Sequence, residues 1–156
     1  AARAGAYNGF NLIVGDGASL WYYGSREGAM RPIEPGVHGL SNHLLDEPWP
    51  KVRRGRSVMQ AALDDADPAP RLFQMLSDAK PAPDAELPDT GVGITWERRL
   101  ATALITGEDY GTRCSTVVCF AASGAIRFEE RTRLGDGSVS TRAEHRFHID
   151  ALGAAA

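Results

Sequence analysis

The sequence predicts an α+β fold, in which helices are separated along the chain from antiparallel strands. Strand patterns joined by a turn come first, helical patterns occupy the middle, and a run of strands with tight turns forms the C-terminal third. A chain of 156 residues can bury about 70% of the surface that it exposes when unfolded, so we expect one domain.

The first predicted unit is a hairpin. Residues 10–14 are mostly apolar, Asp16-Gly17 is a typical turn pair, and residues 20–23 are rich in aromatic side chains. The following RPIEPG segment is interrupted by two prolines, which indicates a loop or a short edge strand.

Two helices are expected next. The first begins at Pro50, a residue type favoured in the first turn. Its expected apolar stripe is Val52, Met59, Ala62 and Leu63, and its basic side chains are expected mostly to face solvent: Lys51, Arg53, Arg54 and Arg56.

The second helix is expected to have Asp67 as its N-cap and Pro68 at its first position. Its buried side is predicted to be Leu72, Phe73 and Leu76. Residues 79–93 are rich in Pro, Asp and Gly, as in an exposed loop, whereas residues 96–104 fit either a short helix or irregular structure.

The C-terminal third is expected to be an antiparallel meander. Residues 116–121 are apolar on both faces, which predicts a central strand. In the next strand Ile126 and Phe128 alternate with charged residues, which predicts one face exposed to water. The strand over residues 143–149 alternates in the same way.

Both cysteines lie in the first strand of this meander. Cys114 and Cys119 are separated by about 16 Å of strand and point to opposite faces, so they cannot form a disulfide with each other. We expect two reduced, buried thiols and a reducing compartment.

Composition excludes several classes of function. The net charge of −3 gives no reason to expect a nucleic-acid partner, and no apolar run is long enough to span a membrane. Residues 1–6 do not resemble a signal peptide and are expected to be unstructured, as is the tail over residues 151–156. The high content of Ala, Arg, Asp and Gly indicates a bacterial, cytoplasmic protein.

The sequence carries no common catalytic or metal motif. His145 and His148 would face opposite sides of a strand, and no zinc spacing, phosphate loop or Gly-x-Ser-x-Gly elbow occurs. We therefore expect no metal and no resident cofactor, although one of the histidines could still bind a haem iron.

Two polar residues at the ends of apolar segments are the remaining candidates. Asn42 follows VHGLS, and an Asn amide can stabilise an oxyanion. Arg113 precedes the strand CSTVVCF, and an Arg can bind a carboxylate or phosphate through two hydrogen bonds. Each residue could equally be a turn former or a surface charge.

Four stretches together resemble one protein family. YNGFNLIVGD, LWYYGSREG, PGVHGLSNHLLDEPWPKVRRG and YGTRCSTVVCFAASGAIRFEER are similar to the transport and Golgi organisation protein 2 family, also called the NRDE family. Its members are longer, begin with Met-Cys and carry an Asn-Arg-Asp-Glu motif. Residues 7–150 are therefore expected to be the C-terminal part of one such domain, with the N-terminal half missing.

The resemblance implies a fold and a site. The family resembles the N-terminal-nucleophile hydrolases, which implies part of a four-layer αββα sandwich with antiparallel sheets. By the same analogy Asn42 is the oxyanion donor and Arg113 a second site arginine. The matching motifs add three residues that bind substrate: Asn11, Ser41 and Thr112.

The resemblance also implies two alternative functions. In the first, the protein is a carrier that binds a small molecule (an acyl-coenzyme A, a lipid or haem). In the second, it is a cysteine amidohydrolase acting on acyl amides, inert in this chain because the N-terminal Cys is absent. Strands missing from the sandwich would leave sheet edges exposed, so self-association is expected.

Overall fold

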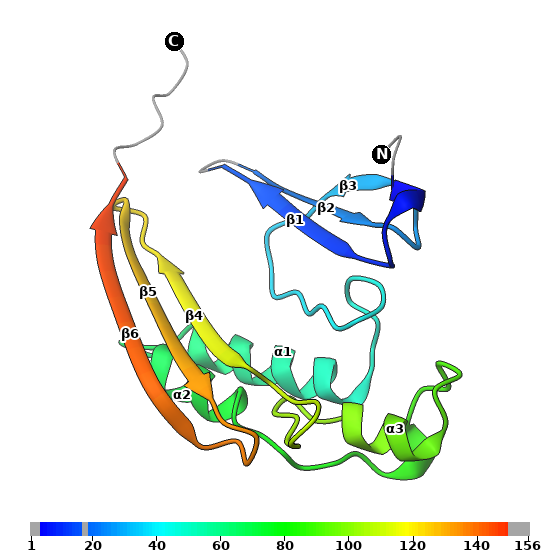
Figure 1. The fold of residues 1–156 in the computed structure, drawn as a ribbon. Helices are drawn as coiled ribbons and strands as arrows, with labels where there is room; N and C mark the ends of the chain where they lie inside the picture. Colours follow the sequence, from blue (N-terminus) through cyan, green and yellow to red (C-terminus); the bar gives the residue numbers. More distant parts are fainter. Residues whose placement is uncertain (1–3, 17–18, 150–156) are drawn as a thin grey trace.

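The computed structural model describes residues 4–16 and 19–149. Within them, two three-stranded antiparallel sheets are formed by the two ends of the chain, and the helices come between them in sequence (Figure 1). The α+β class is confirmed. Turn residue Gly17 and the expected tail over residues 151–156 lie outside the described residues.

The first sheet has the order β1-β2-β3 and contains the predicted hairpin. Its strands are β1 (Asn11–Gly15), β2 (Leu20–Gly24) and β3 (Met30–Pro32). β3 is the short edge strand expected in the proline-interrupted segment. A single turn of 3-10 helix, η1 (Ala4–Ala6), precedes the sheet in the segment that we expected to be unstructured, since a run of small residues can adopt this turn without steric cost.

The middle of the chain holds α1 (Pro50–Ala62), α2 (Ala69–Met75), η2 (Asp84–Glu86) and α3 (Ile94–Leu100). α1 begins at the predicted proline. α2 begins one residue later than predicted, yet the Asp67 carboxylate still caps it by accepting a hydrogen bond from the Ala69 N–H at 3.1 Å. The ambiguous residues 96–104 are helical up to Leu100, and the irregular segment after it is largely buried.

The predicted apolar stripe of α1 is wrong by about one residue. Val52 and Ala62 are buried, but Met59 is 39% exposed and Leu63 is 61% exposed. The row that faces the protein contains Lys51, Gly55 and Ala62, which lie on one side of a helix at intervals of four and seven residues. Lys51 therefore faces inward, contrary to the sequence-based expectation.

The second sheet has the order β4-β5-β6. Its strands are β4 (Cys114–Phe120), β5 (Ala125–Arg133) and β6 (Val139–His148). The prediction that the apolar strand β4 is central is wrong, because among the described residues β4 pairs only with β5 and forms an edge. Only one face of β4 is covered, since Ser115 and Val117 are buried whereas Val118 and Phe120 on the other face are exposed.

The charged face of β5 is not exposed to water, contrary to the prediction. Glu129 is only 7% exposed, and Arg131 places its guanidinium 3.6 Å from the centre of the Phe73 ring of α2. The charged row thus faces the helices, where Glu129 pairs with both Arg127 and Arg131. On the opposite face Ile126 of β5 is itself only 5% exposed, while its neighbours Phe120 of β4 and Phe147 of β6 are 71% and 52% exposed.

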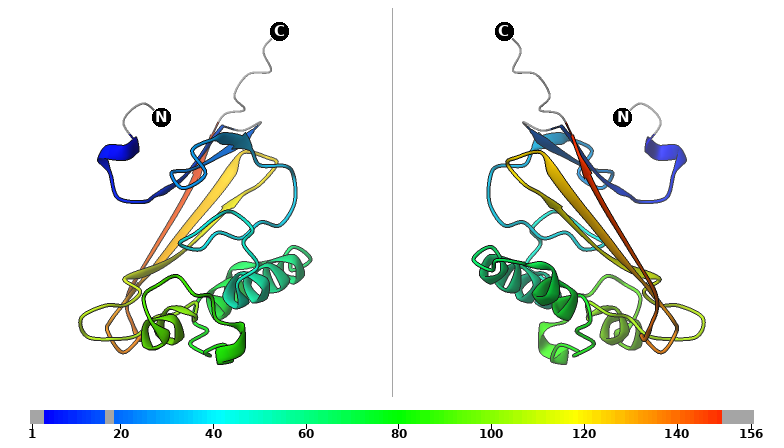
Figure 2. Two further views of the ribbon diagram at one scale, coloured as in Figure 1. Left: turned by 90° about the vertical axis from the view of Figure 1, so that its right-hand side faces the viewer. Right: turned by 90° about the vertical axis from the view of Figure 1, so that its left-hand side faces the viewer.

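The helices and the first sheet lie at different ends of the second sheet (Figure 2). The segment of residues 36–49 runs between these ends and leads into α1 (Figure 1). A small apolar core joins α1 and α2 to β4, and its members are Ala62, Ala69, Leu72, Phe73 and Val117. This arrangement places residues 36–49 next to both helices and sheets.

Both thiols are free, as predicted, but Cys114 is exposed rather than buried. It begins an edge strand on the face that no helix covers. None of the helices that the structure describes is long and apolar enough to cross a membrane.

Candidate functional site

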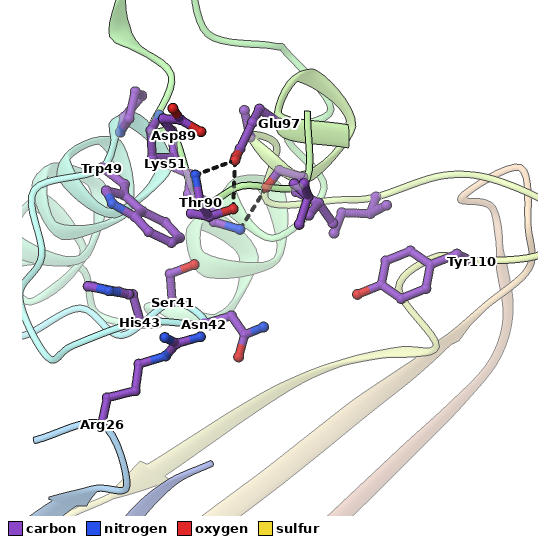
Figure 3. A pocket seen from close by; sticks show the side chains of 16 residues that line it. Arg26, Ser41, Asn42, His43, Trp49, Lys51, Asp89, Thr90, Glu97 and Tyr110 are labelled. Carbon is purple, nitrogen blue, oxygen red and sulfur yellow. Dashed lines mark hydrogen bonds between the residues drawn. The ribbon is translucent and has the colours of Figure 1, made fainter. Parts of the chain in front are cut away.

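A cavity with a volume of about 740 Å³ lies where residues 41–43, the first turn of α1, residues 88–92 and α3 meet (Figure 3). Small-molecule sites usually have volumes of roughly 300–1,000 Å³, so its size is suitable for a ligand. Asn42 and Lys51 line it together with aromatic side chains, among them Trp49 and Tyr110.

Asn11 holds the loop that carries Asn42. Its amide nitrogen donates to the backbone carbonyl groups of His43 (3.0 Å) and Ser41 (3.5 Å). Its amide oxygen accepts a hydrogen bond from the Tyr22 hydroxyl at 2.8 Å, and Tyr22 is fully buried. One side chain of β1 therefore connects the first sheet to the cavity wall.

A second contact closes the same loop from the other side. Asp46 has a φ of 64°, and its carboxylate accepts from the Gly39 N–H at 2.9 Å and contacts His38 Nδ1 at 2.6 Å. His38 Nε2 lies 2.8 Å from the Glu34 carbonyl oxygen. Gly39 is required here, because a Cβ at this position would lie 2.7 Å from Val52 of α1.

The His38–Asp46 contact shifts the pKa values of both side chains. The hydrogen bond to Asp46, followed by that to the Glu34 carbonyl, raises the pKa of His38. Burial acts to raise the pKa of Asp46, but the hydrogen bonds from His38 and Gly39 lower it overall. Only a protonated imidazole can donate to both oxygen atoms, so the geometry favours a charged His38.

Lys51 places its amine inside the cavity. Its Nζ donates to the Leu100 carbonyl oxygen at 2.8 Å, and burial lowers the pKa of the amine (Figure 3). Among the described residues, no carboxylate oxygen lies within 4.0 Å of this nitrogen. The amine thus keeps hydrogen-bonding capacity that the protein does not use.

The most deeply buried acidic side chain of the cavity wall already has hydrogen-bond partners. Glu97 is 5% exposed, and its carboxylate accepts from the Thr90 N–H (2.7 Å) and hydroxyl (2.6 Å). These bonds fasten residues 88–92 to α3. Glu97 is therefore a structural part of the wall.

A second cavity of about 460 Å³ adjoins the first, and the two share Ser41, Lys51 and Ile105. It runs between the helices and β4, and its walls are largely apolar, including Met59, Met75, Leu76 and Val117. The Ser41 hydroxyl at the junction is buried, and within the described structure it has no hydrogen-bond partner. A buried hydroxyl without a partner favours a polar ligand atom at that point.

The five candidate residues from the sequence occupy different places. Ser41 and Asn42 line the large cavity, and Asn11 lies behind it. Thr112 exchanges hydrogen bonds with Ile105 and so shapes the wall from outside. Arg113 is exposed, does not line the cavity, and offers its backbone carbonyl to the Arg133 N–H.

Sequence reasoning missed Lys51 and Glu97 as cavity residues. Lys51 could have been found from the helical row that it shares with Gly55 and Ala62. Glu97 gave no such signal, because its partner Thr90 belongs to a loop whose path the sequence does not indicate.

Comparisons with known proteins agree with the four motifs. The sequence matches the family described as Transport and Golgi organisation 2 over residues 1–135. A Transport and Golgi organization protein 2 homolog from Bos taurus is 37% identical over an alignment of 163 residues that covers 94% of this chain and 58% of the relative.

The homolog from Homo sapiens is 34% identical and that from Mus musculus 33%, each over 82% of this chain and 52% of the relative. The chain thus spans about half the length of these curated relatives. Because all three are mammalian, they lend no support to the bacterial source expected from composition.

Proposed function

The chain belongs to the Transport and Golgi organisation 2 family, and we propose that it is a carrier that binds a small amphipathic molecule in the cavity around Ser41 and Lys51. The observation that carries this proposal is the junction of the two cavities, one with polar groups and one with apolar walls. A ligand with a polar part and an apolar part matches both.

The arrangement suits binding better than chemistry. The cavity offers an amine, an amide and a hydroxyl, and each can hold a polar group in place. Within the described lining, Ser41 has no hydrogen bond to a base, which a serine nucleophile would need. An acyl-coenzyme A, a lipid and haem are candidate ligands, since each combines an anionic group with a large apolar surface.

The relatives are named for transport and Golgi organization. A carrier that takes up an amphipathic molecule at one site and releases it at another is compatible with the word transport in these names. The cavity is open enough for exchange, because Asn42 at its rim is exposed.

The amidohydrolase alternative is favoured by one observation, which is that Asn42 lines the cavity and could direct its N–H donors at a bound carbonyl. In this reading the whole protein would supply the nucleophile. The two readings differ in what happens to the ligand, which remains intact in a carrier and is cleaved by a hydrolase.

We further propose that the whole protein forms the layered sandwich implied by the resemblance. The face of the β4-β5-β6 sheet opposite the helices exposes Val118, Phe120 and Phe147. Apolar side chains of this kind usually pack against a second sheet about 10 Å away. The support is the pattern of the face and its position opposite the helices.

Native mass spectrometry of this chain tests the proposed function. The chain is incubated separately with palmitoyl-coenzyme A, palmitate and haemin, and Asn42→Ala is compared with Asn8→Ala, which changes an exposed asparagine outside both cavities. We expect an intact, non-covalently bound ligand on wild type and on Asn8→Ala.

A second incubation, of the full-length protein with an acyl amide, distinguishes the alternatives. Cleavage of an acyl amide by the full-length protein, lost in Asn42→Ala but not in Asn8→Ala, would establish the hydrolase. Absence of every ligand from the wild-type chain, with folding confirmed by circular dichroism, would refute the carrier.

A further inference from the structure

We propose that Lys51 and Ser41 form an anion-binding subsite at the junction of the two cavities, so that the ligand is an anionic amphiphile whose carboxylate or phosphate contacts Lys51. The inference rests on the proposed function, because it assumes that the cavities bind a ligand. It goes further by stating which end of the ligand lies where.

The first argument is the state of the Lys51 amine. An ammonium group has three N–H donors, and the structure uses one of them on the Leu100 carbonyl. Burial has removed part of its hydration, as the lowered pKa shows, and no described carboxylate lies within ion-pair distance. A partly buried cation without a counter-ion gains most from an anion that arrives with the ligand.

The second argument is the Ser41 hydroxyl, which is independent of the lysine. It is buried without a hydrogen-bond partner in the described structure, and Ser41 lines both cavities together with Lys51. A carboxylate or phosphate has enough acceptor oxygens to take hydrogen bonds from the amine and the hydroxyl together. A neutral alcohol or ester would satisfy them less well.

The third argument is the direction of the apolar cavity. From the junction it extends past Met59, Met75 and Leu76 toward Val117 of β4. Methionine side chains adapt to ligands of variable shape, which suits an alkyl chain. The anion is therefore placed at the junction and the apolar tail between the helices and β4.

The nearby acidic groups do not cancel this subsite. Glu97 is held by Thr90, and Asp89 is exposed at the cavity rim. Arg26, from the turn after β2, adds a second cation to the lining and reaches toward Asn42 (Figure 3). A ligand with a second anionic group, such as a phosphate ester, could use Arg26 as well.

The test measures binding of dansylaminoundecanoic acid by fluorescence and compares it with the methyl ester of the same probe. In wild type we expect the acid to bind about tenfold more tightly than the ester, the ratio that one charge-assisted hydrogen bond supplies. Lys51→Met should bring the acid to the affinity of the ester. Lys80→Met, which removes the other lysine of the chain at an exposed position outside both cavities, should change neither.

Competition with dodecanoate, dodecyl phosphate and dodecanol identifies the head group. Displacement chiefly by dodecanoate assigns a carboxylate, and displacement chiefly by dodecyl phosphate assigns a phosphate. Either result supports the subsite. Lys51→Met is used only if circular dichroism shows that it folds. Otherwise the ratio of the affinities for the acid and the ester, measured in wild type and in Ser41→Ala, alone tests the subsite.

Two negative results have different meanings. Equal binding of the acid and the ester by wild type would overturn the anion subsite and leave the amphipathic carrier standing. No binding of either probe or of any competitor would overturn both the subsite and the proposed function.

Discussion

Asn11 and Tyr22 show how single polar side chains of the first sheet control a loop about 30 residues further along the chain. The resemblance to known relatives implied that Asn11 binds substrate. In the structure it positions residues 41–43 through two backbone carbonyl groups, and Tyr22 orients its amide. A side chain outside the cavity can thus position the residues that line it.

The two residues are expected to differ when mutated. Asn11→Ala should lower both the free energy of unfolding and the affinity for the fluorescent acid, because the Asn42 loop loses its donor. Tyr22→Phe should lower the free energy of unfolding by about 1–3 kcal/mol, since one buried oxygen loses its partner, with a smaller effect on affinity. Urea titration and probe binding measure both quantities, and equal loss of affinity in the two variants would contradict the positioning role of Asn11.

His38 makes the stability of the folded chain depend on pH. Because the pKa of His38 is raised from the ordinary value of 6.5, the folded chain holds this proton more tightly than the unfolded chain. Its contribution to stability is therefore complete below pH 6.5 and is lost as the pH rises through the folded-state pKa.

Asp46→Asn is the variant that tests this dependence. Between about pH 5 and about pH 9 the difference in urea midpoint between wild type and Asp46→Asn should shrink as the pH rises. Taking a difference removes most of the contribution of the other three histidines, which are present in both proteins. A difference that grows with pH would show that the charged form of His38 is not the stabilising one.

At the scale of elements, the positions of helices and strands followed from the sequence, but several of their orientations did not. Prolines and turn residues mark the ends of α1, β3 and β5 with an error of one or two residues. The buried face of α1 and the covered face of β5 depend instead on partners distant in sequence. Alternation shows that a strand has two different faces without showing which one the helices cover.

The charged row of β5 is expected to contribute to stability. Glu129→Gln should lower the free energy of unfolding by about 2 kcal/mol, because it leaves two half-buried guanidinium groups without their shared carboxylate. Glu108→Gln, at an exposed loop position, is the matched control. Equal urea midpoints for the two variants would show that β5 faces the helices less closely than described.

At the scale of the whole molecule, the sequence indicated the fold class and the family but not the cavity. Ser41 and Asn42 were found because they belong to a recognisable motif. The remaining lining comes from residues 88–92, α3 and Tyr110, segments without regular periodicity. Their meeting is determined by tertiary contacts such as those between Thr90 and Glu97.

The open face of the second sheet is expected to make this chain associate with a second copy. Phe120 and Phe147 are 71% and 52% exposed on that face, and β4 and β6 are its edges. Contiguous apolar surface and free strand edges favour association. Sedimentation velocity should therefore show an average mass that rises with concentration.

Phe120→Ser should reduce this association, whereas Leu134→Ser, at an exposed position after β5, should not. Both changes replace an exposed large apolar side chain by serine, and the two positions lie on different surfaces. A concentration-independent monomer for wild type would contradict the expectation.

The separation of the two sheets along the chain has a consequence for folding kinetics. Each sheet is made of neighbouring strands joined by short turns, so each can form from local contacts. The cavity needs the long-range bonds of Asn11 and Lys51, whose partners are 30 to 49 residues away. We expect these bonds to form after the transition state, in which case a bound ligand would slow unfolding while leaving the folding rate almost unchanged.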